Sequence, residues 1–171
     1  MNNVINNVVG QFKDKVFDVN TGELLYETDW SKNTIVNGLN RAIAYAFAGM
    51  GGISYWAVGS GSDSWDLQNP PTAQATDTGC VNEIGRKAIQ ASDIKFIDSD
   101  NRESSSVTNR IQITVTFTEN ECNGVWREFA IFGGNATTTL KSGIAINHKN
   151  HATMVKTNSM VVERQIRFTF N

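Results

Sequence analysis

The sequence has little cysteine, little proline and few charges, and it lacks a long apolar run. Two cysteines in 171 residues are too few for the disulfide framework of a small secreted scaffold. No apolar segment approaches the roughly 20 residues that span a bilayer. The N-terminus shows no secretion signal either, since no basic region precedes an apolar stretch. Fifteen Lys and Arg against seventeen Asp and Glu give a net charge of −2, which argues against nucleic-acid binding.

The residues that are abundant favour a folded, β-rich chain. Asn, Thr, Ser and Gly recur throughout, which is typical of strands joined by tight turns. A hydrophobic content of 40% excludes wholesale disorder, and no Gly-X-Y period or sustained heptad indicates a fibre. The length suits one hydrophobic core, so residues 1–171 are expected to form a single domain.

Hydrophobic periodicity places the secondary structure. Residues 1–30 are expected to be extended and to include a β-hairpin, because two apolar segments flank Asn20-Thr21-Gly22. A helix is expected near residues 34–48, where Ile35, Leu39, Ile43 and Phe47 recur every fourth residue and predict one buried face. Gly49 is expected to end it. Residues 84–96 fit a strand, or a short helix leading into one.

The second half alternates apolar and polar residues with a period of two, as in Ile111, Ile113, Val115 and Phe117. Further strands are expected over residues 53–58, 126–132, 140–146 and 161–170, the last with Ile166, Phe168 and Phe170 facing inward. The sequence therefore predicts a mainly β, α+β fold: an antiparallel sandwich or barrel with the helix near 34–48 packed on it. Trp56 and Trp126 are expected in its core.

Residues 60–79 are predicted to form a long surface loop. This segment is polar and contains both prolines, Pro70 and Pro71, and it is expected to be the most mobile part of the chain. Such a loop can become ordered on a neighbouring subunit, with an exposed Trp65 as its anchor. The residues proposed for this interface are Trp65, Asp66, Leu67, Pro70 and Pro71.

The residue types that carry chemistry do not form a recognisable site. Two aspartate pairs, Asp63 with Asp66 and Asp98 with Asp100, lie in polar segments where Asp ordinarily forms turns. Gly59-Ser60-Gly61-Ser62 lacks the Lys-Ser/Thr of a phosphate-binding loop. We therefore expect no catalytic residues and no enzymatic activity.

A metal centre is the sharpest alternative. Cys80, Cys122, His148 and His151 would make a nominal Cys2His2 set. The cysteines lie far apart in the sequence, and the histidines lack a helical His-Glu-x-x-His context. Two exposed loop histidines and two unrelated thiols are the simpler interpretation, although a disulfide remains possible. No zinc and no other cofactor is expected.

Four segments together resemble a known family. They are Ile35-Val36-Asn37-Gly38-Leu39-Asn40-Arg41-Ala42-Ile43-Ala44, Ile53-Ser54-Tyr55-Trp56-Ala57-Val58-Gly59-Ser60-Gly61, Asn82-Glu83-Ile84-Gly85-Arg86-Lys87-Ala88-Ile89, and Arg127-Glu128-Phe129-Ala130-Ile131-Phe132. Their order and spacing resemble the N-terminal, baseplate-attaching region of tail-fibre proteins of contractile-tailed bacteriophages. Ser62 stands where an acid often follows the second glycine in such proteins. No long shaft follows, so a free-standing version of this module is expected.

The resemblance implies a non-enzymatic virion structural protein of the tail, baseplate or fibre-attachment region. It would be made in the host cytoplasm and would assemble with other virion proteins and with copies of itself, without nucleic acid or membrane as partners. A capsid decoration protein or a collar or neck protein is the alternative within the virion. From another class, the β-rich pattern and the loop tryptophan fit a carbohydrate-binding module that recognises a host-surface glycan.

Overall fold

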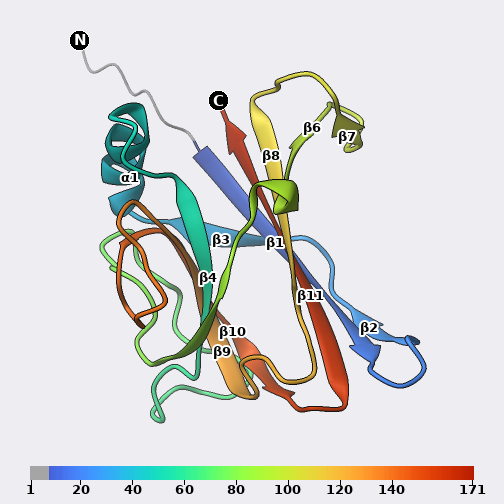
Figure 1. Cartoon of the computed structure of the whole chain (residues 1–171). Coiled ribbons are helices and arrows are strands. Elements are labelled where there is room, and N and C mark those ends of the chain that lie inside the picture. Colours follow the sequence, from blue (N-terminus) through green and yellow to red (C-terminus); the bar gives the residue numbers. More distant parts are fainter. Residues whose placement is uncertain (1–7) are drawn as a thin grey trace.

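The computed structural model describes residues 8–171, which form one antiparallel sheet with a helix at one end (Figure 1). Within this range the strands are β1 (Val8–Asp18), β2 (Leu24–Glu27), β3 (Ser31–Ile35), β4 (Ile53–Gly59), β5 (Glu83–Ala88), β6 (Ile94–Ile97), β7 (Glu103–Ser104), β8 (Arg110–Phe117), β9 (Gly124–Gly133), β10 (Ile144–Lys156) and β11 (Met160–Phe170). The helix α1 spans Gly38–Phe47, and a 3-10 turn, η1, spans Ala91–Asp93. Neither has the length and apolar character needed to cross a bilayer.

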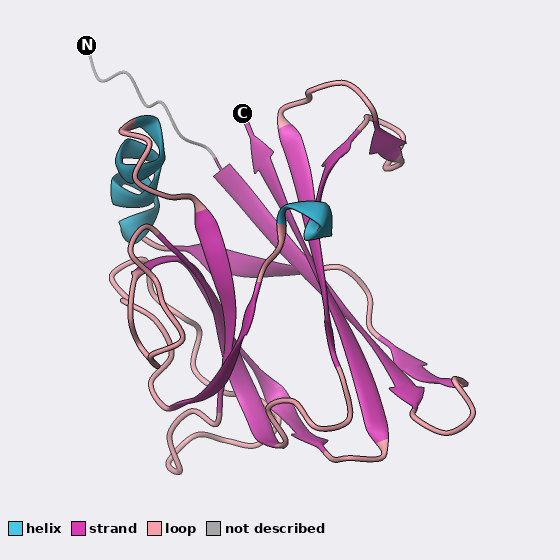
Figure 2. Ribbon diagram, in the orientation of Figure 1, coloured by secondary structure: helices cyan, strands magenta, loops and turns pink. Residues whose placement is uncertain are grey.

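The sheet folds over on itself to make a sandwich. Its strand order is β5-β4-β9-β10-β3-β1-β11-β8-β6-β7, and β2 pairs with β1 beside β3. The short β3 joins β10 to β1 and so links the two halves, which cross in Figure 2. The rings of Phe12 on β1 and Phe129 on β9 pack together, with 5.0 Å between their centroids. Phe117 of β8 packs edge-on against Trp126 of β9, with 4.9 Å between the ring centroids. The sheet does not close into a barrel. Of the two predicted arrangements, sandwich or barrel, the sandwich is therefore confirmed.

The period-two pattern correctly predicts the buried faces. Ile113, Val115 and Phe117 of β8 are buried, and so are Ile166 and Phe168 of β11. Phe170 was expected on the same inner face, but it lies at the end of β11 and remains 38% exposed. Both Trp56 and Trp126 are fully buried, as predicted. The strand expected over residues 140–146 begins only at Ile144, because Lys141 has a positive φ of 61° in the preceding turn.

The predicted N-terminal hairpin is confirmed for the described residues. β1 and β2 pair antiparallel, and the Asp18 carboxylate accepts the backbone N–H groups of Asn20 and Thr21, each at 2.9 Å. Gly22 has a positive φ of 69°, as the turn requires. Residues 1–7 of the predicted segment lie outside the described residues. For residues 84–96 the sequence left open a strand or a short helix leading into one. The structure contains both, because the strand β5 is followed by the 3-10 turn η1 and then by the strand β6.

The helix is shorter than predicted, and the predicted buried face is wrong at both ends. Ile35 is not in the helix but belongs to β3. Within the helix, Leu39 is buried and Ile43 is half-buried, whereas Phe47 is 89% exposed. The buried residues of α1, Leu39 and Ala42, both lie in its N-terminal half. The helix contacts β10, and Gly38 at its first turn lies against Ala145 and Ile144. Phe47, in the last turn, faces solvent. Gly49, with a φ of 71°, ends the helix as predicted.

This difference predicts unequal effects of two truncations in one helix. Leu39→Ala should lower the free energy of unfolding by about 2 kcal/mol or more, because it removes buried methyl groups. Phe47→Ala should change it by less than about 0.5 kcal/mol, because that ring contacts mainly solvent. Urea denaturation followed by circular dichroism measures both. Equal losses for the two variants would contradict the helix position described here.

Candidate functional site

The carboxylate of Glu128, on the central strand β9, is the hub of the most connected polar cluster. It is completely buried. Its Oε1 accepts the backbone N–H groups of Gly61 and Asn82, both at 2.9 Å, and its Oε2 accepts that of Val81 at 2.8 Å. Three backbone donors thus surround one anion, and the Gly59-Ser60-Gly61 turn holds a carboxylate of the chain itself in the way that such turns hold phosphate.

His148, on β10, connects Glu128 to the long loop. Its Nε2 lies 3.0 Å from Glu128 Oε2, and its Nδ1 lies 2.7 Å from Asp77 Oδ2. Burial disfavours a charged imidazole, but the hydrogen bonds to Glu128 and Asp77 outweigh burial and raise the pKa of His148. Burial likewise opposes ionisation of Glu128, yet the bonds from His148, Asn82 and Val81 lower the pKa of that carboxyl. Both shifts favour the charged forms of this buried pair.

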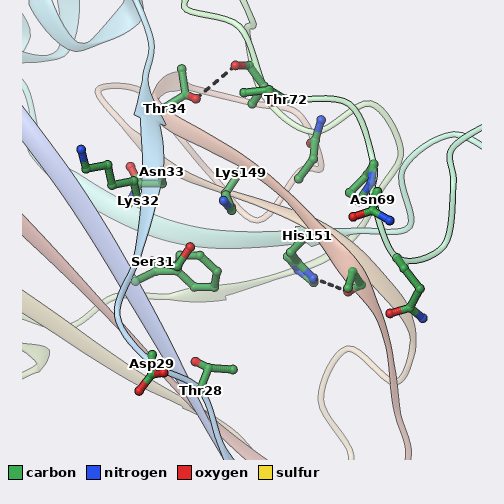
Figure 3. Close-up of a pocket in the computed structure, with 16 residues that line it drawn as sticks. Thr28, Asp29, Ser31, Lys32, Asn33, Thr34, Asn69, Thr72, Lys149 and His151 are labelled. Atoms are coloured by element: carbon green, nitrogen blue, oxygen red, sulfur yellow. Dashed lines mark hydrogen bonds between the residues drawn. The ribbon is translucent and has the colours of Figure 1, made fainter.

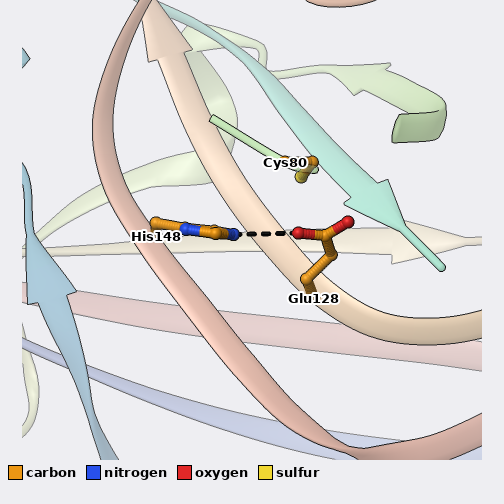
Figure 4. A group of neighbouring side chains, drawn as sticks. All are labelled: Cys80, Glu128 and His148. Atoms are coloured by element: carbon orange, nitrogen blue, oxygen red, sulfur yellow. Dashed lines mark hydrogen bonds and ion pairs between the residues drawn. The ribbon is translucent and has the colours of Figure 1, made fainter. Parts of the chain in front are cut away.

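Cys80 completes the cluster (Figure 4). Its Sγ, a carboxylate oxygen of Glu128 and a ring nitrogen of His148 all lie within 4.8 Å of one another, and all three residues are buried. Burial, followed by the nearby charges of Glu128 and Glu83, raises the pKa of the Cys80 thiol well above its ordinary value. The thiol is therefore protonated, which is the opposite of an activated nucleophile.

A second ion pair fastens the neighbouring strand β5. Glu83 and Arg86 form a bidentate pair, with Nε–Oε1 at 2.6 Å and Nη2–Oε2 at 2.9 Å. The guanidinium also donates to the carbonyl of Thr137 at 2.7 Å, and Glu83 accepts the backbone N–H of Lys141 at 2.7 Å. The Glu-x-x-Arg segment thereby holds the turn before β10.

Three of the four segments singled out in the sequence converge here. They are the Gly59-x-Gly61 turn, the segment from Asn82 to Arg86, and the strand from Glu128 to Phe132. Only glycine fits at position 59, because a Cβ there would lie 2.5 Å from Glu128 Oε1 and 2.7 Å from the Asn82 carbonyl oxygen. The segments are far apart in sequence and form one connected unit in the fold.

The loop over residues 60–79, which the sequence predicts to be the most mobile part of the chain, is hydrogen-bonded to the body at several points. Arg127 donates to the carbonyls of Ser62 at 2.8 Å and Trp65 at 3.1 Å. Further along, polar groups of β3 and β10 donate to backbone carbonyls of the loop. The Thr153 N–H donates to Leu67, the Asn150 side-chain amide donates to Pro71, and the Thr34 hydroxyl donates to Ala73.

The five proposed interface residues differ in exposure. Trp65 is half-buried, because its ring covers Gly61, where a Cβ would lie 2.3 Å from the ring; the expectation of an exposed tryptophan is wrong. Asp66, Leu67 and Pro71 are exposed, and Pro70 is half-buried. Leu67, at 58% exposure, is therefore the apolar side chain that this loop presents to solvent.

The remaining candidates are turn formers or belong to other clusters. Asp66 accepts the N–H groups of Gln68 and Asn69, and Asp98 accepts those of Asp100 and Arg102, as expected of Asp in turns. The proposed Cys2His2 set does not assemble around the hub among the described residues, since the hub cluster takes Cys80, His148 and Glu128. Cys80 and Cys122 are free thiols. Both histidines lie on β10, so exposed loop histidines were the wrong expectation.

His151 belongs to a third cluster, between the two halves of the sandwich. Arg164 of β11 forms a bidentate pair with Asp14 of β1, at 2.9 Å for both bonds, and its Nη2 lies 3.0 Å from His151 Nε2. The guanidinium lies 4.8 Å from the Trp126 ring centroid. Burial, with the adjacent Arg164, lowers the pKa of His151 to about 3, so this imidazole is neutral.

A polar groove of about 610 Å³ lies between β3, β10 and the loop (Figure 3). Lys32 and Asn33 come from β3, Asn69 from the loop, and Lys149 from β10. Phe12 is an aromatic ring of its lining, and Lys149 Nζ lies 5.5 Å from that ring's centroid. The loop tryptophan does not line this groove.

Sequence reasoning missed the hub residue Glu128 and the buried Arg164. One signal could have found both. Arg164 falls on the inward phase of β11, with Val162, Ile166 and Phe168. Glu128 follows Arg127 in a strand whose other residues are apolar or glycine. A charge at a core position implies a buried partner. No protein-family model matches the chain, and no curated protein matches it either.

Proposed function

We propose that this chain is a non-enzymatic structural protein of a tailed-phage virion, from the tail, baseplate or fibre-attachment region. The sequence segments on which the resemblance rests support this proposal because they contact one another. The glycine turn, the segment at Asn82 and Glu83, and the strand at Glu128 together form an internal scaffold. The polar groups of the hub are turned inward and hydrogen-bonded to each other. Such a unit stabilises a module that works through its outer surface.

The observation that carries the assembly role is the projecting hairpin. β2 lies away from the body in Figure 1, and its edge opposite β1 pairs with no other strand in residues 8–171. Leu24, Leu25 and Tyr26 are 45–50% exposed. Consecutive apolar residues are typical of strands buried on both faces, and an exposed apolar strand edge is a template for pairing with another chain.

The partner that fits this edge is a second copy of the same chain. Antiparallel pairing about a two-fold axis between Leu25 and Tyr26 would place Leu24 opposite Glu27 and Leu25 opposite Tyr26. No two like charges would then face each other, and Glu27 would keep its ion pair with Lys13. A two-fold contact of this kind is the commonest symmetry of protein assembly.

Leu25→Asp is expected to convert the oligomer to a monomer, because it places a charge directly opposite Tyr26 of the second copy. Light scattering after size-exclusion chromatography measures the mass. Leu140→Asp is the matched control, since Leu140 is 46% exposed on a different turn and should leave the mass unchanged. A monomeric wild-type chain, or an oligomer that Leu25→Asp does not disturb, would contradict the hairpin contact.

The virion assignment has its own test. Mass spectrometry of purified particles of the encoding phage should find this chain at many copies per particle, and electron cryo-microscopy should place it in the tail. Placement in the head or neck would favour the decoration or collar alternative. Absence from purified particles would contradict the proposal.

A carbohydrate-binding module remains the second candidate because of the groove at Lys149, Asn69 and Phe12. Amide and ammonium groups around an aromatic ring are suited to sugar hydroxyls. A glycan array with the wild-type chain tests it. Binding that Lys149→Ala abolishes would favour this function, and no binding to any glycan would exclude it.

A further inference from the structure

The hub offers a donor set that is independent of the assembly surface. Cys80 precedes β5, Glu128 lies on β9 and His148 lies on β10, so three separate segments each bring one side chain to the same buried point (Figure 4). Thiolate, imidazole and carboxylate are the three ligand types that zinc takes in proteins. We propose that Cys80, Glu128 and His148 bind one Zn²⁺ ion.

The geometry needs little adjustment. Zinc bonds of about 2.0–2.3 Å in a tetrahedral arrangement hold ligand atoms about 3.3–3.8 Å apart. His148 Nε2 and Glu128 Oε2 are already 3.0 Å apart, and no pair of ligand atoms in the cluster is separated by more than 4.8 Å. Closing the contact with Cys80 therefore requires a shift of at most about 1.0–1.5 Å.

The outer contacts are those of a metal-binding histidine. His148 Nδ1 lies 2.7 Å from Asp77 Oδ2, which orients the ring and leaves Nε2 facing Glu128 and Cys80. Metal-bound histidines ordinarily give their second nitrogen to such a carboxylate. Glu128 Oε1 is held by Gly61 and Asn82, and Oε2 accepts the Val81 N–H at 2.8 Å. On metal binding Oε2 would exchange its contact with His148 for the ion and keep the bond from Val81.

Negative partners for the ion are already in place. The Glu128 carboxylate is a proposed ligand, and Asp77 lies directly behind His148, with its Oδ2 2.7 Å from His148 Nδ1. A divalent cation here would therefore not be a lone buried charge. The expectation of no zinc, drawn from ligand spacing, is revised here because spacing could not reveal Glu128 as the third ligand.

The test uses the full chain, purified without a polyhistidine tag, stripped with a chelator and titrated with Co²⁺ and then Zn²⁺. About one Co²⁺ per chain should bind, with a thiolate-to-cobalt charge-transfer absorption that Zn²⁺ abolishes. Cys80→Ala should remove this absorption, and the matched control Cys122→Ala should retain it. Asp77→Asn should weaken binding about 10–100-fold.

Circular dichroism of the metal-free proteins shows whether Cys80→Ala still folds. Cys80 carries a small side chain among apolar neighbours, so this variant should keep the wild-type spectrum. If it does not fold, Cys80→Ser serves in its place. Absence of the charge-transfer absorption in the wild-type chain, or equal binding by wild type and Cys80→Ala, would overturn the proposal. Neither outcome bears on the hairpin contact or on the virion assignment.

Discussion

Replacing Glu128 by glutamine is expected to lower the free energy of unfolding by about 3–5 kcal/mol in metal-free protein. The glutamine amide presents an N–H donor where Oε2 now accepts from Val81 and His148. It therefore leaves the buried His148 with one carboxylate partner, Asp77, and sets an amide N–H against the N–H donor of Val81. Urea denaturation measures the loss. Glu103→Gln is the control, because Glu103 forms an exposed pair with Lys95 and such pairs contribute little.

The same variant should alter the pH dependence of stability. The pKa of His148 is raised above its ordinary 6.5, so its contribution is complete below pH 6.5 and is lost as pH rises through the folded-state pKa. The pKa of Glu128 is lowered from 4.5, so its contribution is complete above pH 4.5 and is lost as pH falls through the folded-state pKa. The difference between wild type and Glu128→Gln should be largest between these values. A difference independent of pH would contradict a charged pair.

Arg164→Met is expected to cost about 3–5 kcal/mol, because it leaves the carboxylate of Asp14 buried without its bidentate partner. Asp14 is only 3% exposed, and Arg164 is completely buried. The double variant Asp14→Leu/Arg164→Met should recover most of this loss, since two apolar side chains remove the unpaired charge.

Thermal and urea denaturation of the two single variants and the double variant measure this coupling. Arg102→Met is the control, because the Arg102 side chain is 72% exposed. This variant should leave the unfolding midpoint nearly unchanged. A double variant as unstable as Arg164→Met would show that shape, rather than charge, governs this part of the core.

The paired-charge clusters explain why the candidate site was only partly predictable. The segments that meet at Glu128 were recognised as a pattern along the chain, yet nothing in that pattern says that Gly61 and Val81 both bind Glu128, 67 and 47 residues away. Each hydrogen bond depends on the position of a strand that only the complete sheet defines. The same holds for His148, whose local context of Asn147, Lys149 and Asn150 suggested an exposed loop.

The sequence by itself determined much of the local structure of this protein: most of the strands, the hairpin at Gly22, the end of the helix at Gly49, and the inward faces of β8 and β11. These features depend on the side-chain period of two and on the backbone freedom of glycine, which act over a few residues. Only the tertiary structure decided that Ile35 is a strand residue, that Phe47 is exposed, that the long loop is fastened by Arg127, and that Glu128 meets His148 and Cys80. Those outcomes depend on which segments pack together, because burial and hydrogen bonding between distant residues exist only once the sheet has folded over at β3.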